Sequence, residues 1–180
     1  MELILQKVSG RPARFPIRLR RCGPADAAAF FALQNEVRAA MPHPEQFVPD
    51  TLENITAYLR EDLCIGAYDG ERLGAYFILR YCGRSAHNYA AFLGVPREEW
   101  EHWANADSAV VHPDWRGNGL QRKLLEAALP LVRPGIVGIG ATVSPENQYS
   151  LNNALACGFV IADRREMYGG YDRYLLKKML

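Results

Sequence analysis

Residues 107–122, DSAVVHPDWRGNGLQR, combine the residue types that could hold a phosphorylated ligand. A predicted strand is followed by a turn containing Gly117 and Gly119, and the turn leads directly into a predicted helix. Glycine lets a backbone turn sharply and lets a ligand approach the amides closely. The first turn of a helix presents N–H groups and a partial positive charge, which together favour phosphate binding. Arg116 and Arg122 add charge beside this candidate phosphate site.

Two common nucleotide-binding motifs do not match this turn. No G-K-[ST] follows the glycines, and their spacing is not G-x-G-x-x-G. A plain strand–turn–helix connection would carry similar residues, because short glycine motifs often occur by chance. The turn alone therefore leaves open whether it binds a ligand.

The residues around the turn resemble a known family. Residues 111–120 read V-x-P-x-x-R-G-x-G-L, which is similar to the acetyl-CoA signature of the GNAT acetyltransferases. A second block at residues 144–159, SPENQYSLNNALACGF, is similar to that family's V-x-P-x-N-x-x-[AS]…G-F segment and follows the next predicted strand. The resemblance extends over residues 17–180. It implies the α/β GNAT acyl-CoA N-acyltransferase fold, a mixed central sheet flanked by helices, in a single domain of residues 1–180.

The resemblance also implies a reaction and a set of cofactor contacts. Acetyl-CoA is the implied co-substrate, and an amine, on a small molecule or a protein, is the implied acceptor. In the family, the strand before the turn pairs with the pantetheine arm and polarises the thioester carbonyl. The turn amides hold the pyrophosphate, and the second block adds an Asn and a small residue. The matching positions are Ala109, Val110, Val111, Arg116, Gly117, Asn118, Gly119, Leu120, Gln121, Arg122, Asn147 and Ser150.

Two positions depart from the family pattern. Gln121 stands where Gly or Ala is usual, and Ala154 stands where many members place the Tyr that protonates the departing thiolate. Because a free thiol has a pKa near ~8.5, a thiolate is a fair leaving group without that acid. Tyr149, Tyr168 or a water molecule could supply the proton. The missing Tyr also motivates an alternative function, a non-catalytic acyl-CoA-binding module.

A base is needed on the acceptor side, since an alkylamine with a pKa of ~10.4 is largely protonated at neutral pH. Alternation along the strand before the turn predicts one polar and aromatic face, which suits a substrate groove, and one face of small residues. The polar face comprises Glu101, Trp103, Asn105 and Asp107. Asp107 and Glu101 are the candidates for the base or water-positioning residue. For Glu101 a solvated surface position is an equal alternative, and His112 ranks lower than both.

Clues to the acceptor are limited to residues 81–103. This segment mixes aromatic and acidic side chains, which could bind a cationic amine. The alternative is that the aromatic rings cap the core and the glutamates face solvent. Tyr168 and Tyr171 could form an opposite wall. The residues concerned are Tyr81, Tyr89, Phe92, Trp100, Trp103, Glu98, Glu99 and Glu101.

The elements that must position these residues follow from periodicity and turn signals. Asp50, with Glu53 three residues later, predicts the N-terminal cap of a second helix. Residues 83–101 are predicted to be irregular, with a short helix at 96–103. The predicted strands are 17–21, 63–68, 73–81, 105–111, 136–143, 159–167 and 173–180; the other predicted helices are 26–41, 120–129 and 149–157.

Composition excludes several functional classes. The chain has 180 residues, of which 49% are hydrophobic, and a net charge of +1, so we expect no nucleic-acid partner. A local cluster of Arg11, Arg14, Arg18, Arg20 and Arg21 is interpreted as the solvent face of an edge strand. No apolar run suits a signal peptide or a membrane span. The four cysteines show no metal-ligand spacing, so we expect reduced thiols in a cytoplasmic protein; whether the chain forms a homodimer stays open.

Overall fold

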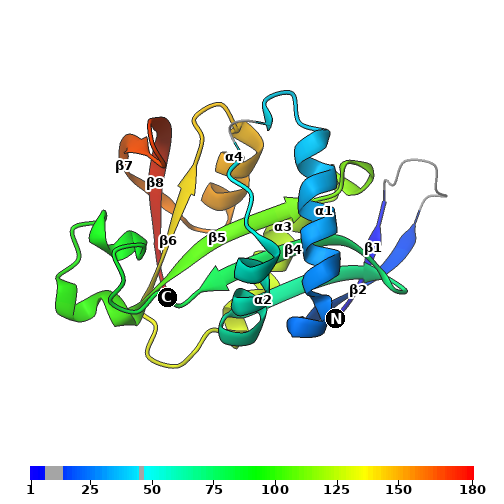
Figure 1. Cartoon of the computed structure of the whole chain (residues 1–180), viewed down its shortest axis with the longest axis horizontal. Coiled ribbons are helices and arrows are strands. Elements are labelled where there is room, and N and C mark those ends of the chain that lie inside the picture. Colours follow the sequence, from blue (N-terminus) through cyan, green and yellow to red (C-terminus); the bar gives the residue numbers. More distant parts are fainter. Residues whose placement is uncertain (7–13, 45–46) are drawn as a thin grey trace. The chain divides into compact units, whose positions relative to one another are not determined.

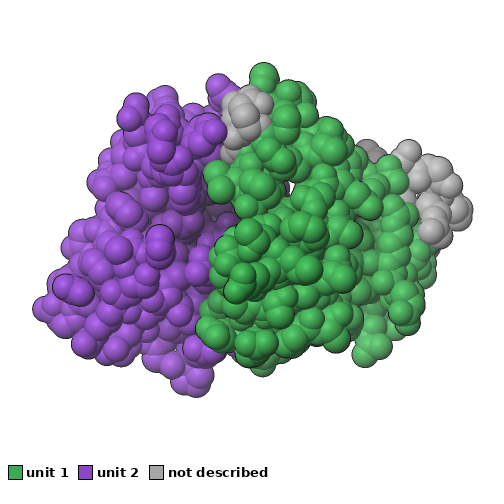
Figure 2. All heavy atoms as spheres, viewed as in Figure 1, with its two compact units in different colours: residues 1–78, 108–130 green, residues 79–107, 131–180 purple. Residues whose placement is uncertain are grey.

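The computed structural model describes residues 1–6, 14–44 and 47–180; Arg11 of the basic cluster lies outside them. The chain divides into two compact units, which Figure 2 colours separately. Unit 1 comprises Met1–Ile78 and Ser108–Pro130, and unit 2 comprises Leu79–Asp107 and Leu131–Leu180.

The described residues form eight strands and four α-helices (Figure 1). The strands are β1 (Glu2–Leu5), β2 (Phe15–Arg21), β3 (Leu63–Asp69), β4 (Arg72–Arg80), β5 (Trp103–Val111), β6 (Gly138–Val143), β7 (Val160–Met167) and β8 (Tyr171–Met179). The α-helices are α1 (Ala27–Ala39), α2 (Leu52–Glu61), α3 (Leu120–Ala128) and α4 (Gln148–Ala156). Short 3₁₀ helices occur at Pro24–Asp26, Tyr89–Ala91, Arg97–His102, Pro113–Trp115 and Leu129–Leu131.

The strands are hydrogen-bonded in the order β1-β2-β3-β4-β5-β6-β8-β7. β5 and β6 are parallel, whereas β1 and β2, β2 and β3, β6 and β8, and β7 and β8 are antiparallel. The predicted mixed sheet with flanking helices is therefore confirmed.

Unit 1 buries apolar side chains on both faces of its strands. Helices α1 and α2 cover one face (Figure 1). Beneath them the ring of Phe30 stacks on Tyr76, with 4.3 Å between centroids. Helix α3 packs against β3 and buries Leu120, Leu124, Leu125 and Ala128. The periodic apolar positions of these helices thus form the core that supports the turn before α3.

The prediction that residues 17–21 form an edge strand is wrong. β1 pairs with β2 in the register from Glu2↔Arg18 to Leu5↔Phe15, so β2 has a neighbour on each side. The alternation itself is correct, since Ile17 and Leu19 are buried and Arg18 is exposed. β1 was missed because four residues are too few to show a periodic pattern.

The predicted cap of α2 is displaced by one residue. Thr51 is the N-cap, and its hydroxyl accepts a hydrogen bond from the Asn54 amide at 3.1 Å. Asp50 is engaged elsewhere, because its carboxylate accepts from the Tyr58 hydroxyl and its backbone pairs with the Gln34 side chain. Long-range contacts therefore decided between two adjacent residues that both suit an N-cap.

In unit 2, two buried asparagines hold the segment between β4 and β5. The Asn88 side chain donates to the carbonyl oxygens of Gly83 and Trp100, both at 2.8 Å. Asn105 accepts from the Tyr89 amide at 2.9 Å and donates to the His87 carbonyl at 2.8 Å. The segment is therefore anchored to β5, and its short helix is the 3₁₀ helix Arg97–His102.

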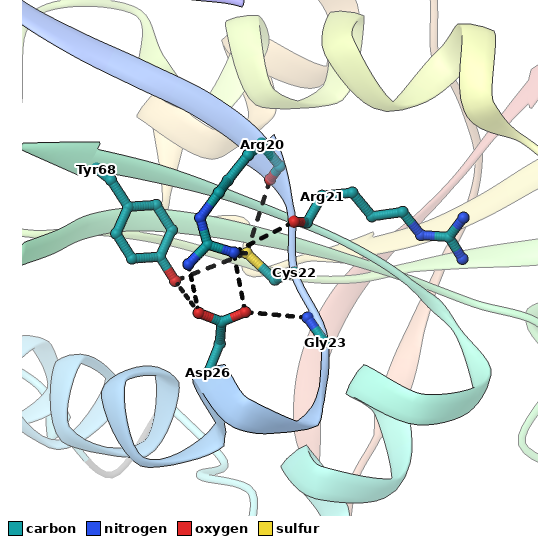
Figure 3. Close-up of polar contacts among 6 residues, drawn as sticks. All are labelled: Arg20, Arg21, Cys22, Gly23, Asp26 and Tyr68. Carbon is teal, nitrogen blue, oxygen red and sulfur yellow. Dashed lines mark hydrogen bonds and ion pairs between the residues drawn. The ribbon is translucent and has the colours of Figure 1, made fainter. Parts of the chain in front are cut away.

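A polar cluster in unit 1 joins β2 to the start of α1 (Figure 3). Arg20 donates to both carboxylate oxygens of Asp26, at 2.6 and 3.0 Å, and stacks on the Tyr68 ring. The Tyr68 hydroxyl and the Gly23 amide also donate to this carboxylate. Burial raises the pKa of Asp26, but these hydrogen bonds outweigh burial and lower it to about 2. Burial raises the pKa of the Cys22 thiol to about 11, so this thiol stays protonated.

Candidate active site

Trp115 anchors the turn before α3 and was not identified from the sequence. Its side chain is only 1% exposed, and its ring meets Phe15 edge-on with centroids 6.2 Å apart. A Cβ placed on Gly74 would lie 2.3 Å from the Trp115 ring, so only glycine fits beneath it. The His112 amide also donates to the Gly74 carbonyl at 2.8 Å. The end of β5 and the turn are therefore fixed on β4.

The two glycines of the turn both adopt left-handed backbone conformations. Gly117 has φ +79°, and Gly119, the N-cap of α3, has φ +64°. Within the described part of the chain, a Cβ at either position would meet no heavy atom within 4 Å. The hydrogen bond from the Lys123 amide to the Gly119 carbonyl, at 3.0 Å, begins the α3 ladder, so the amides of the first helical turn precede it. The turn thus has an open side at a helix N-terminus, which is the geometry that accommodates a phosphate group.

The other turn residues divide between core and surface. Leu120 is buried, so only its backbone can face a ligand, and Gln121 is partly exposed. Arg116 and Arg122 are exposed, and Arg122 lies 3.5 Å from Glu126 one helical turn later. A surface ion pair of this kind is weak, so it does not prevent Arg122 from contacting an anion.

The side chain of Asn118 is used inside the protein. It donates to the Trp115 and Arg116 carbonyl oxygens at 3.0 and 3.3 Å, and its oxygen accepts from the Gln6 amide at 2.9 Å. Any contact of Asn118 with a phosphate therefore uses its backbone amide.

The strand before the turn extends past its register with β6. The parallel pairing runs from Trp103↔Gly138 to Ala106↔Ala141, and β5 then continues to Val111. Val110 is buried in the core beside α1 and α2, whereas Ala109 and Val111 are partly exposed. The three predicted pantetheine positions thus lie beyond the register that pairs β5 with β6.

Asn147 and Ser150 belong to unit 2, where Asn147 is the N-cap of α4. The exposed Asn147 side chain accepts from the Ser150 amide at 3.0 Å. Ala154 lies one turn further along this helix and is partly exposed. Asn147 and Ser150, two of the predicted cofactor contacts, therefore lie at the N-terminus of a second helix.

Two of the three predicted catalytic residues share a neighbourhood in unit 2. The Tyr168 hydroxyl lies 2.7 Å from the Tyr89 hydroxyl and 2.9 Å from the Thr142 hydroxyl, which gives a chain of three hydroxyl groups. Tyr168 has φ +55°, uncommon outside glycine, and its side chain is 44% exposed. Asp107 lies close enough that its charge acts on Tyr89, and Arg80 lies 3.4 Å from its carboxylate.

Tyr89 remains protonated in this chain. Burial raises its pKa well above the ordinary value, and Tyr168 and the negative charge of Asp107 raise it further. Its Cβ also lies over Gly140, where an added Cβ would approach within 2.7 Å. The sequence showed Tyr89 only as one aromatic residue among several, since its link to Tyr168 joins positions 79 residues apart.

The third candidate, Glu101, pairs with an arginine near the protein surface. It precedes β5, its side chain is 49% exposed, and it pairs with Arg84 at 3.1 Å. These features match the solvated-surface alternative. His112 has a local structural role, because its Nδ1 accepts from the Asp114 amide at 3.1 Å.

The predicted groove-lining face of β5 needs correction. Trp103 and Asn105 are only 5% and 1% exposed. The Asn105 side chain bonds to the backbone of His87 and Tyr89, and the Trp103 ring packs on Gly138 of β6. Of the predicted face, Asp107 alone stays partly exposed within β5. The sequence pattern showed the polarity of this face but not the burial of Trp103 and Asn105.

The aromatic rings of residues 81–103 are engaged within the protein. Tyr89 and Trp103 are buried, which matches the core-capping alternative. The other three rings contact the chain's own cations: Arg133 over Tyr81 at 4.1 Å, Arg97 over Trp100 at 5.9 Å and Arg165 over Phe92 at 5.8 Å. Glu98 and Glu99 are exposed. These contacts favour a structural role over an aromatic cage for a substrate cation.

Metal ligation and membrane insertion find no support in the described ranges. No group of three or more His, Cys, Asp or Glu side chains there is arranged to hold a metal ion. Among the same residues, none of the helices has both the length and the apolar character that crossing a membrane requires.

Comparison with solved structures finds the same fold. A GNAT-family acetyltransferase from Streptococcus pneumoniae is 19% identical, with a TM-score of 0.69 over 91% of this chain and 99% of that one. A ribosomal-protein-alanine N-acetyltransferase from Brucella melitensis has the same identity, coverage and TM-score. Arabidopsis thaliana NAA60 in complex with acetyl-CoA is 16% identical, with a TM-score of 0.70 over 91% and 99% of the chains. At these identities the likeness establishes the fold.

Comparison at the sequence level supplies the family. No curated protein sequence matches the chain. The family model described as an acetyltransferase (GNAT) domain matches residues 17–160, which include the turn, α3 and the Asn147 cap. The match covers most of the chain and agrees with the resemblance of the two sequence blocks. The chain therefore belongs to the GNAT acetyltransferase family.

Proposed function

We propose that this protein is an N-acetyltransferase that moves an acetyl group from acetyl-CoA to a primary amine in a ternary complex. The observation that carries the proposal is the turn before α3, with two left-handed glycines, an open side and a helix N-terminus. These features fit a pyrophosphate, because backbone amides and the helix dipole favour anions. The family match and the acetyl-CoA in the NAA60 complex support this choice of acyl donor.

The residues of unit 1 bind the donor in this proposal. The amides of residues 117–122 hold the pyrophosphate, with Arg116 and Arg122 as exposed cations beside them. The backbone of residues 109–111 pairs with the pantetheine arm, since it continues beyond the register with β6. Asn147 and Ser150, at the N-terminus of α4, are further proposed polar contacts for the donor.

The chemical step needs proton transfers at nitrogen and at sulfur. The ammonium group first loses one proton, and the neutral amine nitrogen then attacks the thioester carbonyl carbon. The N–C bond forms, the C–S bond breaks with its electron pair leaving on sulfur, and the nitrogen releases a second proton to Asp107 or water, which gives the neutral amide. We assign Asp107 to the amine side of the reaction. Its carboxylate holds either the ammonium group of the acceptor or a water molecule that takes a proton from the acceptor nitrogen. We assign Tyr168 to the sulfur side as the general acid, because Ala154, at the family's usual Tyr position, has no proton to donate. Its hydroxyl gives a proton to the thiolate and recovers one through Tyr89, Thr142 or solvent.

A binding experiment tests the donor. Acetyl-CoA at ~100 times its Kd should add roughly 2.7 kcal/mol of stability, a rise in Tm of several degrees. Gly119→Val should abolish this shift, because a side chain at φ +64° strains the turn and fills its open side. Gly70→Val, at φ +55° in the β3–β4 hairpin, is the matched control and should keep the shift. An unchanged Tm for the wild-type protein at millimolar acetyl-CoA would refute the proposal.

Release of free CoA thiol then tests catalysis. The acceptor panel comprises a simple alkylamine, a free amino acid, a peptide with a free N-terminus and a peptide with an internal lysine. Release with any of them supports the transferase. Binding of acetyl-CoA without release across the panel would instead support the non-catalytic acyl-CoA-binding module, which Ala154 at the family's Tyr position favours.

A further inference from the structure

Among the described residues, the Asn118 side chain ties the turn before α3 to the residue that follows β1. The Gln6 amide, directly after β1, donates to the Asn118 oxygen at 2.9 Å. The Asn118 nitrogen donates to the Trp115 and Arg116 carbonyl oxygens at 3.0 and 3.3 Å. All these residues lie in unit 1, and Gln6 and Asn118 are 112 positions apart. Asn118 thus links the turn to the end of β1.

The β1–β2 hairpin is held in place at Leu5, directly before Gln6. Leu5 is fully buried and pairs with Phe15, whose ring meets Trp115 edge-on. The N-terminal ammonium group of Met1 donates to the Leu19 carbonyl at 2.9 Å, at the other end of β1. The Gln6 amide is therefore presented from a strand that is held at both ends.

The turn needs such a restraint because glycines flank Asn118 on both sides. Each glycine has wide backbone freedom in the absence of contacts, and binding a ligand to a mobile turn costs that freedom. Hydrogen bonds that order the turn during folding remove this cost from the binding step. Asn118 makes three such bonds, whereas the space beside the two glycines stays open for a ligand.

We propose that Asn118 and β1 form a positioning element that pre-orders the phosphate-binding turn for acetyl-CoA. The inference rests on the proposed function, because it presumes that the turn binds the acyl donor. It assigns residues 1–6, which precede the family match at residue 17, to the donor site. Asn118 and Gln6 act through the backbone of the turn, so they are positioning residues and not catalytic ones.

Two pairs of variants test the element. Asn118→Ala removes this link, and Asn54→Ala, an exposed Asn on α2, is its matched control. Gln6→Pro removes the donating backbone N–H, whereas Gln6→Ala keeps it, so this pair isolates the hydrogen bond from the side chain. Acetyl-CoA affinity is measured by calorimetry well below the Tm of each variant. Hydrogen exchange of residues 115–122 is followed without ligand.

Asn118→Ala and Gln6→Pro should each weaken acetyl-CoA binding roughly tenfold, the scale set by ordering a few residues on binding. They should speed amide exchange in the turn, while Asn54→Ala and Gln6→Ala leave both unchanged. Affinity within about twofold of wild type for Asn118→Ala and Gln6→Pro would overturn the inference and leave the proposed function intact. Failure of the wild-type protein to bind acetyl-CoA would overturn both.

Discussion

Replacing Asp26 by Asn tests how much the cluster of Figure 3 stabilises unit 1. The substitution keeps the size of the side chain but removes the charge that Arg20 contacts through two hydrogen bonds. The pKa of Asp26 falls from 3.8 to about 2 in the folded protein. At about 1.36 kcal/mol per pKa unit, this corresponds to roughly 2 kcal/mol. Arg20 is 39% exposed, and solvent screening reduces the figure to about 1–2 kcal/mol.

The pH dependence of this contribution has a defined sign. The folded pKa lies below the unfolded value, so the carboxylate stabilises the fold fully above the unfolded pKa. The contribution is lost as the pH falls from about 5 to about 2, where the folded carboxylate gains its proton. The amide side chain of the Asp26→Asn variant cannot ionise, so the stability gap between wild type and variant should close over that range.

Urea unfolding followed by circular dichroism at pH 7, 5, 4 and 3 measures both effects. We expect Asp26→Asn to lose about 1–2 kcal/mol at pH 7, with a Tm lower by about 2–8 °C for a chain of this size. Asp163→Asn is the control, because Asp163 also pairs with an arginine but its side chain is 41% exposed. We expect this variant to unfold at the same urea concentration as the wild type. A loss below about 0.5 kcal/mol for Asp26→Asn, or a gap that stays constant from pH 7 to pH 3, would refute the reasoning.

Three further predictions concern the site. Tyr168→Phe should lower kcat for the acceptor found in the panel by at least about tenfold, with acetyl-CoA affinity unchanged, because general acids contribute roughly 10²–10⁴-fold; an unchanged kcat in steady-state assays would exclude Tyr168 as the acid. Glu101→Gln should stay within about twofold of wild type in the same assays, since its partner is the surface residue Arg84; a loss of about tenfold would show that Glu101 reaches the acceptor. Gly74→Ala should cost about 1–3 kcal/mol in urea unfolding and weaken acetyl-CoA binding, because the new methyl group displaces Trp115; wild-type stability would contradict the anchoring role.

Local sequence was sufficient for the elements and for the turn. Periods of two and 3.6 residues placed most strands and helices within a few residues of their observed ends, because these patterns reflect one buried face per element. Gly117 and Gly119 marked the left-handed turn, since only glycine adopts that conformation without strain. The order of the two sequence blocks then indicated the family, which the match to residues 17–160 confirms.

Tertiary structure decided which polar residues meet. Tyr89, Thr142 and Tyr168 come from three separated segments, and no local pattern links their hydroxyl groups. The same holds for Gln6 and Asn118, and for the choice of Thr51 over Asp50 as a helix cap. The face of β5 that the sequence pattern presented as a groove is buried at Trp103 and Asn105, and Asn105 bonds to the distant residues His87 and Tyr89. Local sequence was enough for the glycine turn and the helix that follows it, because their geometry depends on neighbouring residues. Burial and hydrogen-bond partners depend on chain segments far apart in sequence, so only the folded structure revealed them.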